Sequence, residues 1–191
     1  MIRTLISNNC MGGCILHENN MEFCTPTINV HIMPEEFPRF CEELKLYLAD
    51  EVYDYYKVYG KLAPHHEEYL INTYGSVPEY PMGLCCDTLL VFQHYDSFEE
   101  GRAKWLERRE RVDFDNIGYL FMVTDKKWRK YAEDFLKLGL KNAVVLTEGF
   151  DIEGGHRYDV PEGYHRFDLI DNKRVITQNF DIQTFLEGGY A

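Results

Sequence analysis

The sequence has few basic residues for its length. Among its 191 residues, 20 lysines and arginines stand against 32 aspartates and glutamates, which gives a formal net charge of -12. A general nucleic-acid binder needs a basic surface, because the phosphate backbone dominates its affinity. Binding to anionic lipid requires the same positive charge. The composition therefore argues against both classes, and an anionic substrate would have to meet a locally basic site.

Long apolar stretches are missing as well. No run approaches the roughly 20 apolar residues of a membrane-spanning helix, so we expect no integral membrane segment. The start, MIRTLISNNC, has one arginine and a brief apolar run, which is not the pattern of a secretory signal peptide. Without an export signal, the six cysteines are expected to be reduced thiols in the cytoplasm.

The sequence also lacks a metal-binding motif with the usual spacing. Cys85 and Cys86 are adjacent and suit neither an ordinary disulfide nor a zinc knuckle. Cys10 and Cys14 lack the tighter spacing of a zinc or redox pair, and no second pair of cysteines completes a site with them. His65 and His66 lie beside two glutamates. Adjacent side chains rarely converge on one ion within a regular element, so we interpret these histidines as part of a solvated loop.

What the sequence does contain is the composition of a globular domain. Hydrophobic residues make up 45% of the chain, with 14 Tyr and 12 Phe. The length predicts one domain over residues 1–191. Short apolar runs alternate with amphipathic stretches, which predicts an α/β, Rossmann-like fold of three layers: a mainly parallel sheet of about five to six strands with flanking helices.

The clearest unit has the pattern strand, helix, strand. Residues 89–92 and 117–123 are predicted buried strands, and Ser97 with Glu100 forms a capping box that begins the helix between them. Short joints make this unit typical of a right-handed crossover between parallel strands. Ligands bind outside the carboxyl ends of such strands. The candidate site residues there are His94, Tyr95, Asp96, Thr124 and Asp125.

Other elements follow from periodicity. We expect strands at residues 2–6, 27–33, 143–146 and 165–170, and helices at residues 14–19, 35–52, 126–138 and 181–186. Residues 53–81, rich in Tyr and Pro, are predicted to be an irregular excursion. A loop this long in a compact domain is often functional, so a lid and a homo-oligomer contact both remain open as its role.

A polar turn follows the first predicted strand. Its backbone amides and the positive end of the next helix can hold an anion. The candidate phosphate-binding residues are Ser7, Asn8, Asn9, Gly12 and Gly13. The alternative is a tight turn whose asparagines cap their own backbone.

Cys10 lies in the same turn. A thiol before a helix can have a lowered pKa and act as a nucleophile, with His17 or His94 as its base. The alternative is that Cys10 is a small buried hydrophobic residue, as most cysteines are.

The helix after the capping box carries four arginines. At the helical angle Arg102 and Arg109 lie on its apolar face, Arg108 flanks that face, and Arg111 points further away. The glutamates of the helix could neutralise them on a solvated face. Alternatively, one or two arginines face a phosphate or carboxylate, which the planar guanidinium suits.

Several landmarks recur together in the expected order, from the first strand to about residue 125, which is about two-thirds of the chain. They are Ser7-Asn8-Asn9-Cys10 with Gly12-Gly13, Tyr80-Pro81 with Gly83, Asp87, Phe92 with His94-Tyr95, Trp105 with Arg108 and Arg111, and Asp115-Asn116. As a set they resemble a family of bacterial exopolysaccharide-biosynthesis proteins that is known mainly as a domain of unknown function. Met11 and Asp113 depart from the Trp and Asn expected there. The resemblance implies a role in building or modifying surface polysaccharide.

The resulting prediction is a transferase that acts on an activated, nucleotide-linked sugar. The polar turn would hold phosphates together with Arg108 or Arg111, the pair that the resemblance favours. Tyr95 and Trp105 are further substrate-binding candidates, and His94 would be the base that deprotonates an acceptor hydroxyl.

The cofactor is unknown from the residues alone. The residues leave open a divalent metal ion, which Asp125 or Asp87 would hold. The candidate catalytic residues are therefore His94, Asp125 and Cys10.

Two alternatives remain open. A thiol-dependent acyltransferase or hydrolase acting on polysaccharide precursors would use Cys10 as nucleophile. In outline it resembles capsule-biosynthesis acetyltransferases that carry an asparagine-cysteine turn after the first strand. The other alternative is a non-catalytic sugar- or nucleotide-binding protein, since His, Asp and Arg at strand ends serve binding as well as catalysis.

Overall fold

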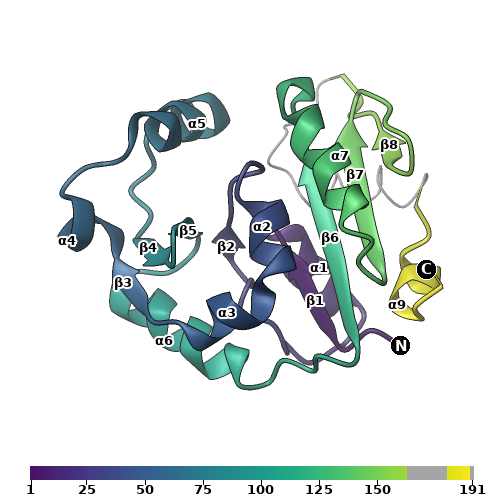
Figure 1. Ribbon diagram of the computed structural model, residues 1–191, viewed down its shortest axis with the longest axis horizontal. Helices are drawn as coiled ribbons and strands as arrows, with labels where there is room; N and C mark the ends of the chain where they lie inside the picture. Colours follow the sequence, from purple (N-terminus) through teal and green to yellow (C-terminus); the bar gives the residue numbers. More distant parts are fainter. Residues whose placement is uncertain (163–179, 190–191) are drawn as a thin grey trace.

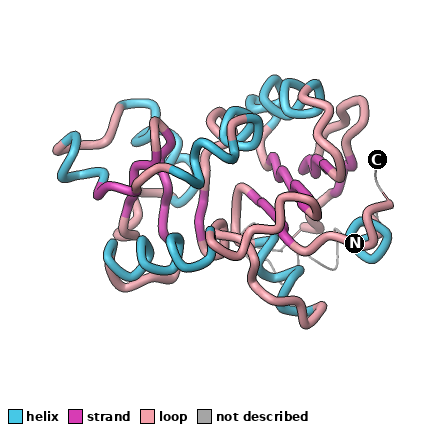
Figure 2. The backbone as a smooth tube through the Cα atoms, turned by 60° about the horizontal axis from the view of Figure 1, so that its bottom comes forward, coloured by secondary structure: helices cyan, strands magenta, loops and turns pink. Residues whose placement is uncertain are grey.

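The computed structural model describes residues 1–162 and 180–189 of the chain. The described strands form two separate four-stranded sheets (Figures 1 and 2). The parallel sheet has the order β1 (Thr4–Ser7), β6 (Ile117–Val123), β7 (Ala143–Glu148), β8 (His156–Tyr158). The antiparallel sheet has the order β2 (Val30–His31), β5 (Thr88–Phe92), β4 (Met82–Cys85), β3 (Val52–Asp54). The predicted α/β class is confirmed, but the strands divide between two sheets where one mainly parallel sheet was predicted.

Both faces of the parallel sheet are buried. Leu120 and Met122 of β6 belong to one apolar cluster, and Phe121 and Val123 to another, because successive side chains of a strand point to opposite faces. Burial on both faces explains why β6 and β7 are continuous apolar runs in the sequence. The helices that contribute to the first cluster are α1 (Met11–Glu18) and α9 (Ile182–Leu186), and those that contribute to the second include α2 (Phe37–Glu42) and α7 (Arg129–Lys137).

The strand pairing in the antiparallel sheet shows why the predicted crossover is wrong. β4 and β5 form a hairpin through the two-residue turn Cys86-Asp87, in which Cys86 has a φ of 52°. The other side of β5 pairs with β2, so β5 has no free edge for a parallel partner. Helix α6 (Phe98–Arg109) therefore leads to the other sheet, where β6 pairs with β1 and β7. The two strands and the helix exist as predicted, but the strands lie in different sheets.

Residues 53–81 are more regular than predicted. After β3 they form α4 (Tyr55–Tyr59) and α5 (Pro64–Tyr74), seen at the left of Figure 1. Asp54 caps α4 by accepting hydrogen bonds from backbone amides, and Gly60 ends it with a φ of 73°. Pro64 occupies the first turn of α5, and Gly75 ends it with a φ of 84°.

This region corrects the interpretation of the two adjacent histidines. His65 and His66 belong to the first turn of α5, and His66 is buried. They are therefore not part of a solvated loop.

The remaining predicted elements agree with observed ones to within a few residues at α1, β1, β7 and α9. The predicted helix at 126–138 is observed as a short 3-10 turn, η1 (Lys126–Trp128), followed by α7. The predicted helix at 35–52 is interrupted at Glu43, which gives α2 and α3 (Leu44–Ala49). The predicted strand at 27–33 is reduced to the two residues of β2. The predicted strand at 165–170 lies outside the described residues.

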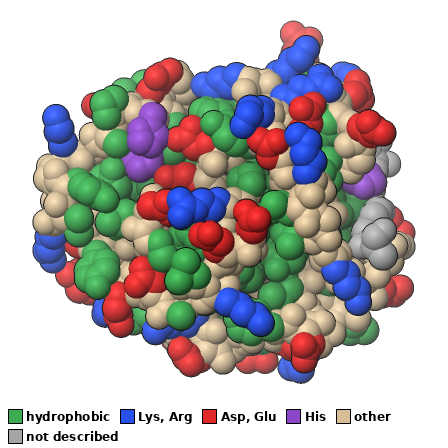
Figure 3. All heavy atoms as spheres, viewed as in Figure 1, with side chains coloured by type: hydrophobic (Ala, Val, Ile, Leu, Met, Phe, Trp, Pro, Cys, Tyr) green, Lys and Arg blue, Asp and Glu red, His purple; other side chains and the backbone are tan. Residues whose placement is uncertain are grey.

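Two further properties of the described residues bear on partners. None of their helices combines the length and the apolar character that crossing a membrane requires. Acidic and basic side chains are interspersed on the face of the molecule that Figure 3 shows.

Candidate functional site

A cavity of about 370 Å³ lies between segments of the two sheets and α5. We call it the central cavity and define it by Cys10, His31, Tyr74, Gln93, His94 and Asp125, which all line it. Its volume falls within the range of roughly 300–1,000 Å³ that is typical of small-molecule sites. Several of the predicted site residues contribute to its wall as a group.

Several predicted site residues meet in this cavity. Asn8, Asn9 and Cys10 follow β1, His94 follows β5, and Asp125 follows β6. Three separate strand ends therefore converge on one space. This is the arrangement expected of ligand sites at the carboxyl ends of strands.

The two asparagines also satisfy the backbone around them. The Asn8 side chain donates to the carbonyl of Met122 over 3.0 Å and accepts from the amide of the same residue over 2.9 Å. The Asn9 Oδ1 accepts from the amide of Met11 over 3.0 Å at the start of α1. Asn9 therefore caps its own turn, as in the tight-turn alternative, whereas Asn8 ties the turn to β6, and both asparagines line the cavity.

Three predicted phosphate-binding residues lie outside the cavity wall. A Cβ on Gly12 would lie 2.3 Å from the Oγ of Ser7, and one on Gly13 would lie 3.4 Å from the side chain of Ile28. Ser7 itself donates to the carbonyl of Asn9 over 2.7 Å. Both glycines therefore permit the close approach of α1 to the rest of the fold.

A hydrogen-bond chain of five side chains runs along the cavity wall. The Cys10 thiol donates to Gln93 Oε1 over 2.8 Å, and Gln93 Nε2 donates to the Tyr74 hydroxyl over 2.9 Å. That hydroxyl lies 3.0 Å from His31 Nδ1, and His31 Nε2 lies 2.7 Å from the Tyr69 hydroxyl. Every bond has one donor and one acceptor if Tyr74 donates to Nδ1 and Nε2–H donates to Tyr69.

Burial keeps this hydrogen-bond chain uncharged. It lowers the pKa of His31 to about 4 and raises the pKa of the Cys10 thiol to about 12. It also raises the pKa of Tyr74. At neutral pH this part of the wall therefore offers a thiol, an amide, phenols and a neutral imidazole.

The surroundings of Cys10 differ from those of an activated nucleophile. Its pKa is raised, whereas activation needs a lowered pKa. Its hydrogen-bond partner is the amide oxygen of Gln93 and not a histidine. His17, one of the two proposed bases, lies in the last turn of α1, whereas Cys10 precedes the first turn.

Aromatic rings form another part of the wall. The rings of Trp128 and Tyr69 have centroids 5.6 Å apart, and those of Tyr74 and Tyr80 are 5.9 Å apart. The Tyr80 ring in turn lies 6.4 Å from the ring of His94. The cavity therefore combines flat apolar surfaces with the polar groups described above.

Asp125 and Lys127 bring opposite charges to the wall. The Asp125 carboxylate accepts from the amide of Lys127 over 2.9 Å, which begins η1. The Lys127 ammonium lies 3.7 Å from this carboxylate and 4.9 Å from the ring centroid of Trp128. Both charged side chains are close to half exposed, so the ion pair is weak. Within the described part of the chain, Lys127 is the only Lys or Arg in this wall.

His94 is exposed at the cavity and has a left-handed backbone, with a φ of 61°. For a residue other than glycine this conformation costs about 1–2 kcal/mol. Such strain clusters at functional sites.

Tyr95, the next residue, is turned to other partners. Its hydroxyl donates to the carbonyl of Ile28 over 3.0 Å and accepts from Arg108 over 2.7 Å. Arg108 also donates to the same carbonyl over 3.4 Å. Arg111, two residues beyond the end of α6, pairs with Glu107 of that helix. None of these described side chains lines the central cavity.

The other residues singled out on α6 are also engaged within the fold. Arg102 donates to the carbonyl of Val52 over 3.0 Å, and Arg109 donates to that of Asp50 over 2.7 Å. Trp105 is buried in the core, and in the described part of the chain its Nε1 has no hydrogen-bond partner. The arginine pair that the helical projection favoured therefore faces backbone carbonyls.

Sequence reasoning missed several residues of the central cavity. His31 lies inside the strand predicted at 27–33 and not at a strand end, where site residues were sought, and Tyr69 and Tyr74 lie in the region predicted to be irregular. The start and stop signals of α5, Pro64 and Gly75, could have indicated that these tyrosines share a helix.

Comparison with known proteins identifies a related protein and a matching protein family. The chain is 29% identical over 144 residues to an uncharacterized protein of Haemophilus influenzae. The match covers 75% of this chain and 61% of that relative, so the chain spans less than two-thirds of the length of the relative. A family described as a domain of unknown function, DUF1919, matches residues 2–150, which include all described cavity residues named above. The chain therefore belongs to the DUF1919 family.

Proposed function

We propose that the central cavity binds the glycosyl group of an activated, nucleotide-linked sugar, and that the protein is a transferase of exopolysaccharide or capsule biosynthesis. The observation that carries the proposal is the composition of the cavity wall. Aromatic rings, among them Tyr74, Tyr80 and Trp128, lie beside the neutral amides of Asn9 and Gln93. A sugar ring has an apolar face and a rim of hydroxyls, so it complements such a wall.

The volume and charge of the cavity suggest how a donor would lie. About 370 Å³ is near the lower end of the range for ligand sites, which favours a sugar-sized group inside. The nucleotide would then extend outside, and its phosphates would pair with Lys127, which is partly exposed. This assigns to Lys127 the role that the sequence assigned to arginines of α6.

His94 is the proposed general base. Its exposed ring beside Tyr80 could take a proton from an acceptor hydroxyl, whose oxygen would attack the sugar carbon that bears the diphosphate. The nucleoside diphosphate would leave with the bonding electrons, and Lys127 would stabilise its charge. Asp125, from the neighbouring strand end, would orient the acceptor or hold a divalent ion.

The thiol-dependent alternative concerns the same cavity. The position of Cys10 in the wall favours it, whereas the raised pKa and the partner Gln93 oppose it. A non-catalytic binding protein would share the ligand and lack turnover. The two alternatives therefore differ from the proposal in measurable ways.

The test is a thermal-shift screen with nucleotide sugars, nucleoside diphosphates, free sugars and acyl-coenzyme A. A ligand that binds only the folded state raises Tm by mass action. We expect a shift with at least one nucleotide sugar. A shift with acyl-coenzyme A alone would favour the Cys10 mechanism, and no shift with any ligand would contradict the proposal.

Matched variants locate the site. Lys127→Ala should weaken binding of the nucleotide sugar at least tenfold and leave binding of the free sugar unchanged. Lys126→Ala is the control, because Lys126 is the neighbouring lysine and does not line the cavity. With a donor identified, His94→Ala should slow transfer by about 10²–10⁴-fold. Unchanged turnover in that variant would exclude His94 as the base, and binding without any turnover in the wild type would favour the binding protein.

A further inference from the structure

We propose that Glu36, His65 and His66 bind a divalent transition-metal ion of the zinc class, at a site separate from the central cavity. Glu36 directly precedes α2, and the two histidines lie in the first turn of α5. One ligand atom from each residue lies within 4.8 Å of those of the other two. Two imidazoles and one carboxylate are a ligand set that zinc accepts.

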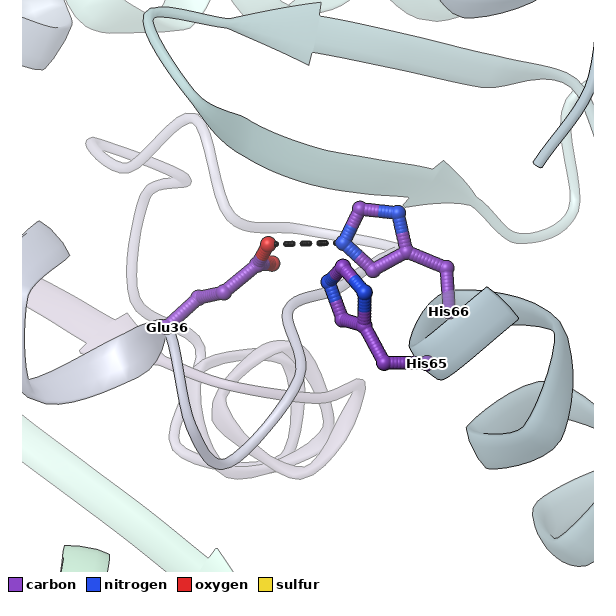
Figure 4. A group of neighbouring side chains, drawn as sticks. All are labelled: Glu36, His65 and His66. Atoms are coloured by element: carbon purple, nitrogen blue, oxygen red, sulfur yellow. Dashed lines mark hydrogen bonds and ion pairs between the residues drawn. The ribbon is translucent and has the colours of Figure 1, made fainter. Parts of the chain in front are cut away.

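The orientation of the three side chains supports convergence on one ion. Figure 4 shows the Glu36 carboxylate pointing toward both imidazoles, which lie next to each other. The ring centroids of His65 and His66 are 4.1 Å apart. Side chains of successive residues in a helix usually diverge. Here they converge, and a carboxylate from a distant element completes the set.

The partners of these ligands resemble the outer shell of a metal site. His66 Nε2 lies 2.9 Å from Oε1 of the fellow ligand Glu36, and its Nδ1 lies 2.9 Å from the Tyr55 hydroxyl, which is the outer-shell partner. A metal-bound histidine almost always has its other ring nitrogen hydrogen-bonded, which fixes the ring. The second carboxylate oxygen of Glu36 accepts from the amide of Leu89 over 3.2 Å. Both buried ligands are therefore already oriented.

Burial distinguishes the site from a surface cluster. The side chains of His66 and Glu36 are 6% and 14% exposed, whereas that of His65 is 58% exposed. The simplest alternative is a buried hydrogen-bonded pair of Glu36 and His66 that serves the fold. That alternative makes no use of His65. The contribution of His65 to metal binding therefore separates the two interpretations.

The site faces a space in which a fourth ligand would fit. Glu36, His65, His66, Tyr59 and Asp87 line a second cavity, of about 360 Å³, which we call the histidine cavity. Three protein ligands with an open position toward a cavity are typical of catalytic zinc sites, where water or substrate is the fourth ligand.

Asp87 is not counted among the metal ligands. Its carboxylate accepts from the Tyr47 hydroxyl over 2.6 Å and pairs with Arg39. Asp87, one of the two aspartates considered for a divalent ion from the sequence, therefore lies beside the proposed ion without binding it.

The experiment uses the full chain, stripped with a chelator and titrated with Zn²⁺ by calorimetry. We expect one ion per chain and a raised Tm in the presence of Zn²⁺. His65→Ala should weaken binding by more than about a hundredfold, because loss of an outer-shell partner alone costs about 10–100-fold. Tyr55→Phe, which removes an outer-shell partner, should weaken Zn²⁺ binding by about 10–100-fold. His17→Ala, an exposed histidine elsewhere, should bind like the wild type.

Two results would overturn the proposal. If the wild type does not bind Zn²⁺, the pair of Glu36 and His66 serves the fold alone. Asp50, Cys85 and Cys86 form another group that could hold an ion. If Zn²⁺ binding is lost in Cys86→Ser and retained in His65→Ala, the ion belongs to that group. Because His65 is mostly exposed, the metal-free Tm of His65→Ala should match the wild type, which shows that lost binding is not unfolding.

Discussion

The central cavity and the histidine cavity are similar in volume, at about 370 and about 360 Å³, and α5 contributes to both. They differ in what surrounds their histidines. In the central cavity both nitrogens of His31 lie against tyrosine hydroxyls, and burial keeps the ring neutral. In the histidine cavity two imidazoles face one carboxylate. Under the two proposals, the partners of a histidine determine whether a cavity suits a hydroxyl-rich ligand or a cation.

The largest expected effect concerns the reactivity of Cys10. With its pKa raised to about 12, its thiolate fraction near pH 8 is about a thousandfold below that of an ordinary cysteine. Iodoacetamide should therefore modify Cys10 about a thousandfold more slowly than an unstructured cysteine, as measured by mass spectrometry of the labelled peptides. Cys14, partly exposed in the next turn, is the internal control. Equal labelling of both residues would show that the wall is not neutral and would restore the thiol mechanism.

A second pair of variants compares how far each cavity is part of the fold. Asn8→Ala leaves the buried amide and carbonyl of Met122 without their partner, which should lower the free energy of unfolding by about 2–4 kcal/mol. His65→Ala, in the metal-free protein, should leave Tm unchanged. Urea unfolding measures the free energy of unfolding of Asn8→Ala, and a thermal melt measures the Tm of His65→Ala. A stable Asn8→Ala protein would mean that the turn after β1 holds its shape without Asn8.

The pH dependence of stability tests whether His31 is neutral. Its folded pKa of about 4 is below the ordinary value of 6.5, so between these values the unfolded chain binds a proton that the folded protein does not. Stability therefore falls as the pH falls through this window, by about 2 kcal/mol at pH 5 relative to pH 7. His31→Gln should lose this component, which urea unfolding at both pH values measures. An identical loss in wild type and variant would contradict a buried neutral His31.

The smallest effects concern two arginines, Arg108 in α6 and Arg111 just beyond its end. Arg108→Ala removes a hydrogen bond to Tyr95 and should lower Tm by about 2–4 °C. Arg111→Ala removes an exposed pair and should leave Tm unchanged. Because neither arginine lines the central cavity, both variants should bind nucleotide sugars like the wild type. Tenfold weaker binding in Arg111→Ala would show that the donor reaches beyond the cavity to α6.

Local sequence signals predicted most individual helices and strands. They could not predict which strands pair, because strand pairing depends on residues far apart in the chain. The apolar run at 117–123 is β6, and the capping box of Ser97 begins α6. The neighbours of β5, in contrast, depend on a hairpin turn made of Cys86-Asp87, which lacks the Asn-Gly or Asp-Gly typical of such turns. The capping residues of α4 and α5 were present in the sequence, but the tyrosine-rich region that contains both helices showed no clear apolar period.

The same distinction holds for the candidate site. The rule that ligands bind at strand ends selected Asn8, Asn9, Cys10, His94 and Asp125, and these residues do line one cavity. It could not select His31 or Tyr74, whose relation to Cys10 depends on how the two sheets and α5 pack. Helical projection ranked the arginines by face but could not reveal that their partners are backbone carbonyls.

The hydrogen-bond chain from Cys10 to Tyr69 gives the central cavity a chemical preference. Cys10 donates to Gln93, which donates to Tyr74, so the proton of Cys10 is engaged by Gln93 while the sulfur lone pairs are not used within the hydrogen-bond chain. A ligand group that reaches this sulfur therefore meets a weak acceptor. An alcohol can donate to it, whereas a ketone or a carboxylate cannot. Under the proposed function, the wall beside Cys10 would therefore favour an alcohol over a carbonyl or a carboxylate.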